Sequence, residues 1–163
     1  MNRPKLKIKL TTVDYIVEII GLIGIICLIV LPIYYFNDLP IRILKHFNAF
    51  GQPDSYGNKV MIWFVPIIAL LLYIGMTILN KYPHIFNYPI KIANENAERF
   101  YKIATKSIRF LKVVIIVSFS YLNFRIIKTG LNETEGIGDI FLPIFLILII
   151  GTIGFMVYEM MKK

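Results

Sequence analysis

The sequence predicts an all-α integral membrane protein with four transmembrane helices. Hydrophobic residues make up 57% of its 163 residues and charged residues only 17%, against roughly 45–50% and about 25% in soluble domains. The apolar residues are also gathered into runs long enough to cross a bilayer core, which takes about 20 residues as a helix. This composition excludes soluble, disordered and collagen-like classes. The single cysteine, Cys27, excludes a disulfide scaffold and a cysteine-based zinc site.

Three of the four predicted spans are clear. They cover residues 15–36, 60–80 and 140–158, and Glu18 is their only charged residue. The remaining run is free of charge only over residues 113–124, which is about 18 Å of helix. Because basic side chains can reach the interface from within the apolar region, we expect a span over residues 108–127; the alternative is a buried or interfacial helix. The prediction is one four-span domain over residues 1–163.

Basic residues orient these spans. Thirteen of the 18 lysines and arginines lie in the N-terminal tail, between Lys81 and Lys112, or at the C-terminus, and five lie in the other two connections. Cytoplasmic loops carry the excess of basic residues. We therefore expect both termini and the loop over residues 81–107 to be cytoplasmic, and the loop over residues 37–59 to be extracytoplasmic. The net charge of +8 then reflects basic loops and not a nucleic-acid partner.

The loop over residues 37–59 is expected to form a compact cap. Residues 39–47 are apolar and partly β-branched, which favours extended chain, and residues 48–58 are rich in turn-forming types. Asn58 is a suitable cap for the second span. His46 and Asp54 suggest either a metal site or a hydrogen-bonded loop. Two ligands are too few for zinc, so we expect no metal and no cofactor.

The loop over residues 81–107 is expected to end in a helix capped by Asn94. Within that helix Lys102, Lys106, Arg109 and Lys112 recur at spacings of four, three and three, which places them on one face. We expect Lys102 and Lys106 to lie at the membrane surface. They would contact anionic lipid head groups or a cytoplasmic partner, or serve only as positive-inside anchors.

Two acidic residues stand at the inner end of the first span. Asp14 and Glu18 are four residues apart and share a helix face, and Arg109 and Lys112 arrive at the same depth from the third span. Carboxylates this close to hydrocarbon are normally paired. We predict a pairing among these four side chains; a proton or cation relay is the alternative, and the absence of an acid from the middle of any span counts against it.

Small and polar residues within the spans predict close contacts between helices, since small residues let backbones approach and polar ones bond across the interface. The residues concerned are Gly21, Gly24, Gly75, Gly151, Gly154, Ser118, Ser120 and Asn123.

Two segments carry a family resemblance. The pattern Leu39-Pro40, His46-Phe47-Asn48, Gly51, Asp54, Gly57 and Lys59 resembles a bacterial membrane domain of unknown function, which also forms the N-terminal part of SdpI-type peptide-toxin immunity proteins. The segment over residues 86–101 is similar to the inner loop of that family. One departure is Leu44, where relatives have proline. The resemblance implies a multi-pass protein of the bacterial cytoplasmic (inner) membrane whose patterned loop faces outward.

Three functions remain open on this basis. The first is a non-enzymatic immunity or envelope-sensing protein that meets a peptide or another membrane protein through its outer loop; the expected binding residues are His46, Asn48, Gly51, Asp54, Gly57 and Lys59. The second is a small oligomeric carrier or channel subunit, and the third is a membrane assembly partner. The sequence holds no catalytic triad, phosphate-binding glycine loop or paired catalytic carboxylates, so we expect no catalytic residues and no enzyme activity.

Overall fold

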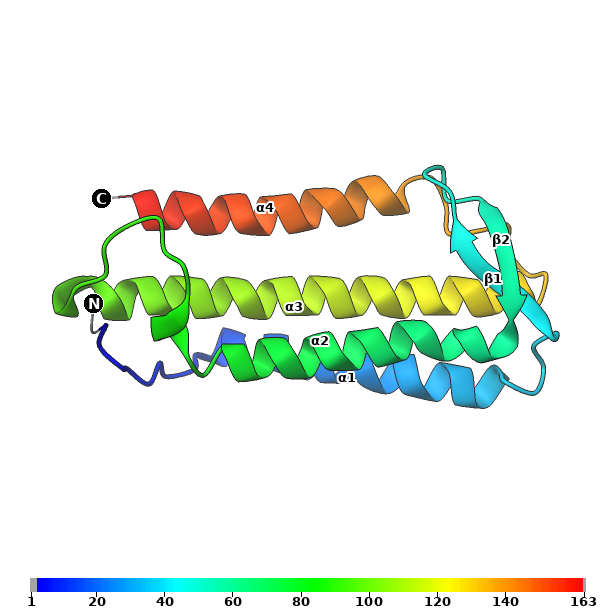
Figure 1. Cartoon of the computed structure of the whole chain (residues 1–163), viewed down its shortest axis with the longest axis horizontal. Coiled ribbons are helices and arrows are strands. Elements are labelled where there is room, and N and C mark those ends of the chain that lie inside the picture. Colours follow the sequence, from blue (N-terminus) through cyan, green and yellow to red (C-terminus); the bar gives the residue numbers. More distant parts are fainter. Residues whose placement is uncertain (1–2, 163) are drawn as a thin grey trace.

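A computed structural model describes residues 3–162 as four long helices with a two-stranded sheet at one end (Figure 1). The long helices are α1 (Thr12–Tyr35), α2 (Phe64–Leu79), α3 (Asn94–Gly130) and α4 (Phe141–Met161). Two short 3₁₀ helices, η1 (Lys59–Trp63) and η2 (Pro83–Ile85), flank α2, and the strands are β1 (Arg42–Phe47) and β2 (Pro53–Asn58).

The four predicted spans are confirmed as helices. α1, α2 together with η1, α3 and α4 are each long and apolar enough to cross a membrane. Local capping explains where two of them begin. The backbone N–H of Thr11 donates to Asp14 Oδ2 at 2.7 Å, and that of Asp14 donates to Thr11 Oγ1 at 3.3 Å, which forms a capping box. As expected, Asn58 caps the 3₁₀ turn ahead of α2, accepting from the N–H of Val60 at 3.0 Å.

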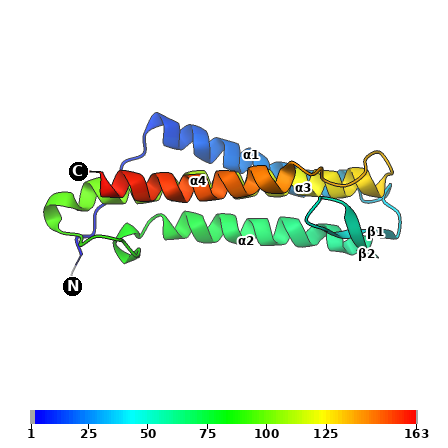
Figure 2. The same ribbon diagram turned by 90° about the horizontal axis from the view of Figure 1, so that it is seen from above.

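The central helix is α3, against which α1, α2 and α4 all pack (Figures 1 and 2). Its 37 residues make it roughly 55 Å long, well beyond the bilayer core of about 30 Å. Much of the predicted loop over residues 81–107 is therefore helical. The prediction that Asn94 caps this helix is wrong. Ala93 occupies the cap position, and its N–H donates to Asn96 Oδ1 at 2.9 Å.

The fold is mostly helical, as predicted, but it is not all-α, because β1 and β2 pair antiparallel. Arg42 lies opposite Asn58 and Phe47 opposite Pro53, with an irregular register around His46. The sequence indicated that residues 39–47 are extended, but it did not indicate which segment pairs with them. Burial supplies the reason for the pairing, since Ile43 of β1 is almost fully buried against the helices. Ile43 packs in one hydrophobic cluster with Leu39, Ile62, Ile126 and Ile127.

Close contact between α1 and α3 follows from small residues. A Cβ at Gly24 would lie 2.7 Å from Ile116 Cγ2, so only glycine fits. Ser120 Oγ donates to the Gly24 carbonyl at 3.0 Å, and Asn123 Nδ2 donates to the Leu28 carbonyl at 3.3 Å. Both side chains thus bond to a neighbouring helix, as predicted for polar residues in a span.

Gly21 is also closely packed, since a Cβ there would lie 3.3 Å from Val113 Cγ2. The other three span glycines behave differently. A Cβ at Gly75, Gly151 or Gly154 would have no neighbour within 4 Å, so the close approach expected at these positions does not occur within residues 3–162. In keeping with this, α4 packs chiefly against α3 and leaves its most apolar stretch uncovered.

The N-terminal tail and the end of α4 meet at the end of the bundle opposite the hairpin (Figure 1). The Tyr101 hydroxyl donates to the Pro4 carbonyl at 3.1 Å, and the Arg99 guanidinium donates to the carbonyls of Glu159 and Lys162. Tyr88, in the connection between η2 and α3, lies at the same end of the bundle. Burial raises the pKa of its hydroxyl, which donates to the Pro83 carbonyl at 2.9 Å.

Candidate functional site

The residues singled out by the sequence fall into two groups at opposite ends of the bundle. We call the first the hairpin site; it comprises His46, Asn48, Gly51, Asp54, Gly57 and Lys59. We call the second the ion cluster; it comprises Asp14, Glu18, Arg109 and Lys112.

His46 and Asp54 form a pair across the hairpin. His46 stands near the end of β1 and Asp54 near the start of β2, so strand pairing brings them together. The distance from His46 Nδ1 to Asp54 Oδ1 is 2.8 Å, and the side chains are 67% and 39% exposed. The pair is therefore hydrogen-bonded across the hairpin and open to solvent.

Asn48 and Gly51 instead build the turn between the strands. Asn48 Oδ1 accepts from the N–H groups of Phe50 at 2.9 Å and Gln52 at 3.0 Å, which is how asparagine stabilises tight turns. Gly51 has a φ of +74°, a conformation that costs little only for glycine. Both residues are committed to the backbone of the turn.

Lys59 and Gly57 hold the base of the hairpin. Lys59 Nζ donates to the carbonyls of Phe36 at 2.9 Å and Leu39 at 3.3 Å, and lies 4.7 Å from the centre of the Phe36 ring. A Cβ at Gly57 would lie 2.8 Å from Met61 Sδ. Four of the six predicted binding residues thus shape the hairpin, while His46 and Asp54 remain presented on it.

The connection between α3 and α4 clamps the hairpin turn, which the sequence analysis missed. The N–H of Ile137 donates to the Gly51 carbonyl at 2.9 Å. Gly136 has a φ of +91°, and a Cβ there would lie 2.2 Å from the same carbonyl oxygen. Arg125 Nε holds the Gly136 carbonyl at 2.6 Å. The sequence feature that could have indicated this contact is the pair of glycines at 136 and 138. Two glycines so close together are also typical of an ordinary flexible loop.

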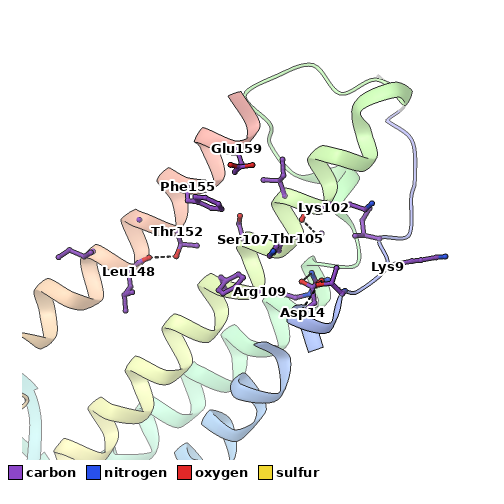
Figure 3. A pocket seen from close by; sticks show the side chains of 17 residues that line it. Lys9, Asp14, Lys102, Thr105, Ser107, Arg109, Leu148, Thr152, Phe155 and Glu159 are labelled. Carbon is purple, nitrogen blue, oxygen red and sulfur yellow. Dashed lines mark hydrogen bonds and ion pairs between the residues drawn. The ribbon is translucent and has the colours of Figure 1, made fainter. Parts of the chain in front are cut away.

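The structure brings all four members of the ion cluster together. Arg109 Nη1 lies 3.1 Å from Asp14 Oδ1, and its Nε lies 3.5 Å from Glu18 Oε1. Lys112 Nζ lies 2.7 Å from Glu18 Oε2. Figure 3 shows the Asp14 and Arg109 side chains pointing toward one another between α1 and α3. The cluster holds two positive and two negative groups, so its formal charges cancel.

Burial makes this pairing obligatory. Asp14 and Arg109 are 5% and 6% exposed, and Lys112 is fully buried. Two residues of α2, which the sequence did not indicate, complete the surroundings of Lys112. Its Nζ donates to Thr77 Oγ1 at 2.9 Å and lies 4.4 Å from the centre of the Tyr73 ring. The ion cluster therefore joins three helices.

Lys102 and Lys106, the predicted surface pair, are exposed on α3. Lys102 Nζ lies 2.7 Å from Glu98 Oε1. The second histidine, His84, lies in η2, at the opposite end of the bundle from His46. Over residues 3–162, no group of three or more His, Cys, Asp and Glu side chains is placed to hold a metal ion.

These features define a multi-pass, mostly helical membrane protein with a clamped hairpin at one end and a neutral ion cluster toward the other. Residues 22–70 match the family model described as a domain of unknown function, DUF1648. The matched part runs from α1 through the hairpin into α2. It includes the first of the two segments that carry the family resemblance and not the second.

The chain is also similar to an uncharacterized protein of the archaeon Archaeoglobus fulgidus. The two are 24% identical over 144 residues, which cover 80% of this chain and 76% of the relative. No solved structure matches the chain.

Replacing Arg109 should destabilise the bundle strongly. An Arg109→Met variant leaves the Asp14 carboxylate buried without its cation, and breaking a buried pair costs about 3–5 kcal/mol. Unfolding in detergent micelles, followed by circular dichroism, measures the loss. The matched control is Lys91→Met, because Lys91 is exposed and outside any ion pair in residues 3–162. Equal stability of the two variants would contradict the structural role of the cluster.

Proposed function

We propose that this chain is a non-enzymatic immunity or envelope-sensing protein of a bacterial cytoplasmic membrane, and that its hairpin site meets a secreted peptide or another membrane protein. The observation that carries the proposal is the exposed His46–Asp54 pair, held at 2.8 Å on the hairpin. The other four residues of the hairpin site are engaged within the fold, so this pair offers the polar groups that a partner can address.

The construction of the hairpin suits recognition. Its turn is fixed by Asn48, by the left-handed Gly51 and by the clamp from Ile137. A surface that is already ordered loses little conformational entropy when a partner binds. Large side chains stand exposed on the same hairpin, at Phe50 in the turn and Tyr56 in β2. Aromatic anchors beside a few placed polar groups are typical of binding hot spots.

The resemblance to SdpI-type immunity proteins supports the same assignment, since the first of its two segments includes the hairpin. The DUF1648 match covers the hairpin as well. The ion cluster offers less support for a carrier, because its four charges pair with one another and transport requires polar groups that reach the middle of the membrane.

The proposal places the hairpin outside the cell, and cysteine labelling tests this. In a Cys27→Ser background, Ser55→Cys on the hairpin should react with a membrane-impermeant maleimide in intact cells. Lys91→Cys, at the opposite end, should react only after permeabilisation, because the basic residues gathered at that end favour the cytoplasm. The reverse pattern would place the hairpin inside and remove the proposal.

A rescue experiment tests the function itself. A strain lacking the protein should become more sensitive to secreted antimicrobial peptides, and the wild-type chain should restore resistance. His46→Ala/Asp54→Ala should fail to restore it at equal abundance, because the exposed pair is lost while the turn is kept. Lys128→Gln/Glu133→Gln is the matched control, since it removes a different ion pair, at 2.7 Å, outside the hairpin. Full rescue by the His46/Asp54 variant would contradict the proposal.

A further inference from the structure

A cleft of about 670 Å³ lies between α3, α4 and the N-terminal tail (Figure 3). This volume falls within the range of ligand pockets, roughly 300–1,000 Å³. The cleft exists because α4 packs chiefly against α3, so that one side of their contact is bounded by the N-terminal tail and the first turn of α1, through Ile8, Thr11 and Asp14. Its deeper walls are apolar and include Phe110, Ile147, Leu148 and Phe155.

The polar groups are concentrated at one end of the cleft. Lys9, Lys102 and Lys106 line that end, together with Thr11 from the start of α1 and Glu159 from the last turn of α4. Figure 3 shows the Lys9 side chain directed away from α3 and α4, so its ammonium group reaches the mouth when the flexible side chain turns. Because α1 starts and α4 ends here, this end lies where the chain leaves the apolar layer. Figure 3 shows Ser107 and Thr152 between the charged mouth and Leu148.

The depth of the cleft matches one leaflet of a bilayer. From Leu148 to Glu159, α4 rises roughly 16 Å, about half of the bilayer core of ~30 Å. A ligand lying along this stretch would have its charged part at the interface and its apolar part directed toward the middle of the membrane.

The charges at the mouth favour an anion. Lys9 and Lys106 are exposed, and within residues 3–162 no carboxylate lies within ion-pair distance of either. Lys102 is balanced by Glu98, and Asp14 is held by Arg109. Glu159 is the remaining acidic residue on the lining, so Lys9 and Lys106 together outnumber it.

The geometry points to a binding site for one anionic phospholipid in this cleft, with the phosphate at Lys9 and Lys106 and an acyl chain along Phe110, Leu148 and Phe155. The combination of a cationic mouth, an apolar floor and a one-leaflet depth fits an amphipathic anion better than a second copy of this chain docked through α4, since α4, whose most apolar stretch is uncovered, carries Glu159 as its one acidic residue. The site is independent of what the hairpin site recognises.

Native mass spectrometry of the detergent-purified chain tests the site, with phosphatidylglycerol and phosphatidylcholine added separately. One phosphatidylglycerol per chain should bind more tightly than phosphatidylcholine. Each lysine near an anionic head group is expected to strengthen binding about fivefold, so the preference should be about 25-fold. Lys9→Gln/Lys106→Gln should abolish the preference, whereas Lys91→Gln should keep it. Equal binding of the two lipids by the wild-type chain would overturn the inference.

A pair of glycines supplies the matched steric test. Gly151 lines the cleft and Gly154 does not, yet a Cβ at either position meets nothing within 4 Å. Gly151→Leu should therefore fill the cleft and prevent phosphatidylglycerol binding, while Gly154→Leu should bind it as the wild type does. Unchanged binding by Gly151→Leu would overturn the inference. Loss of a dimer in the Gly151→Leu spectra would also overturn it, because a second copy would then be the occupant.

Discussion

The arrangement of the first three long helices depends on the ion cluster. Four charged side chains enter an apolar bundle, and an unpaired charge there would cost several kcal/mol. Arg109 and Lys112, one turn apart on α3, face Asp14 and Glu18, one turn apart on α1, and Thr77 of α2 takes a further bond from Lys112. Sliding either helix by a turn would leave at least one of these groups without a partner. The cluster thus sets the register that the contacts farther along α1 and α3 then share.

The rest of the molecule divides into two ends that are held together in different ways. The end that carries the hairpin is held by backbone contacts and an aliphatic cluster beneath Ile43, and it presents a polar pair outward. The other end gathers basic residues, the N-terminal tail and the end of α4. α4 stands apart from α1 and α2, which leaves a cleft open beside α3. The ion cluster, the proposed recognition surface and the proposed lipid cleft therefore lie in different parts of the molecule, although Asp14 and Arg109 also line the cleft.

The sequence predicted whatever depends on local pattern. Runs of about 20 apolar residues located the spans, and the spacing of Asp14 and Glu18 predicted which basic residues they would meet. The sequence could not distinguish Gly24, where a Cβ would collide with Ile116, from Gly151, where a Cβ would have no neighbour within 4 Å. Both are single glycines in an apolar run. The clamp of the α3–α4 connection on the hairpin turn was missed for a related reason. It joins residues far apart in the sequence through their backbone conformation, which the periodicity of apolar residues does not indicate.

A double-mutant cycle across Glu18 and Lys112 tests the central claim most directly. The free energy of unfolding in detergent would be measured for the wild-type chain, Glu18→Gln, Lys112→Met and the double variant. If the ion cluster fixes the helices, the two changes should couple by about 2 kcal/mol, within the range for residues in one ion-pair network, and the double variant should be more stable than the sum of the single losses implies. Losses that add to within about 0.5 kcal/mol would mean that the pair is incidental to the fold.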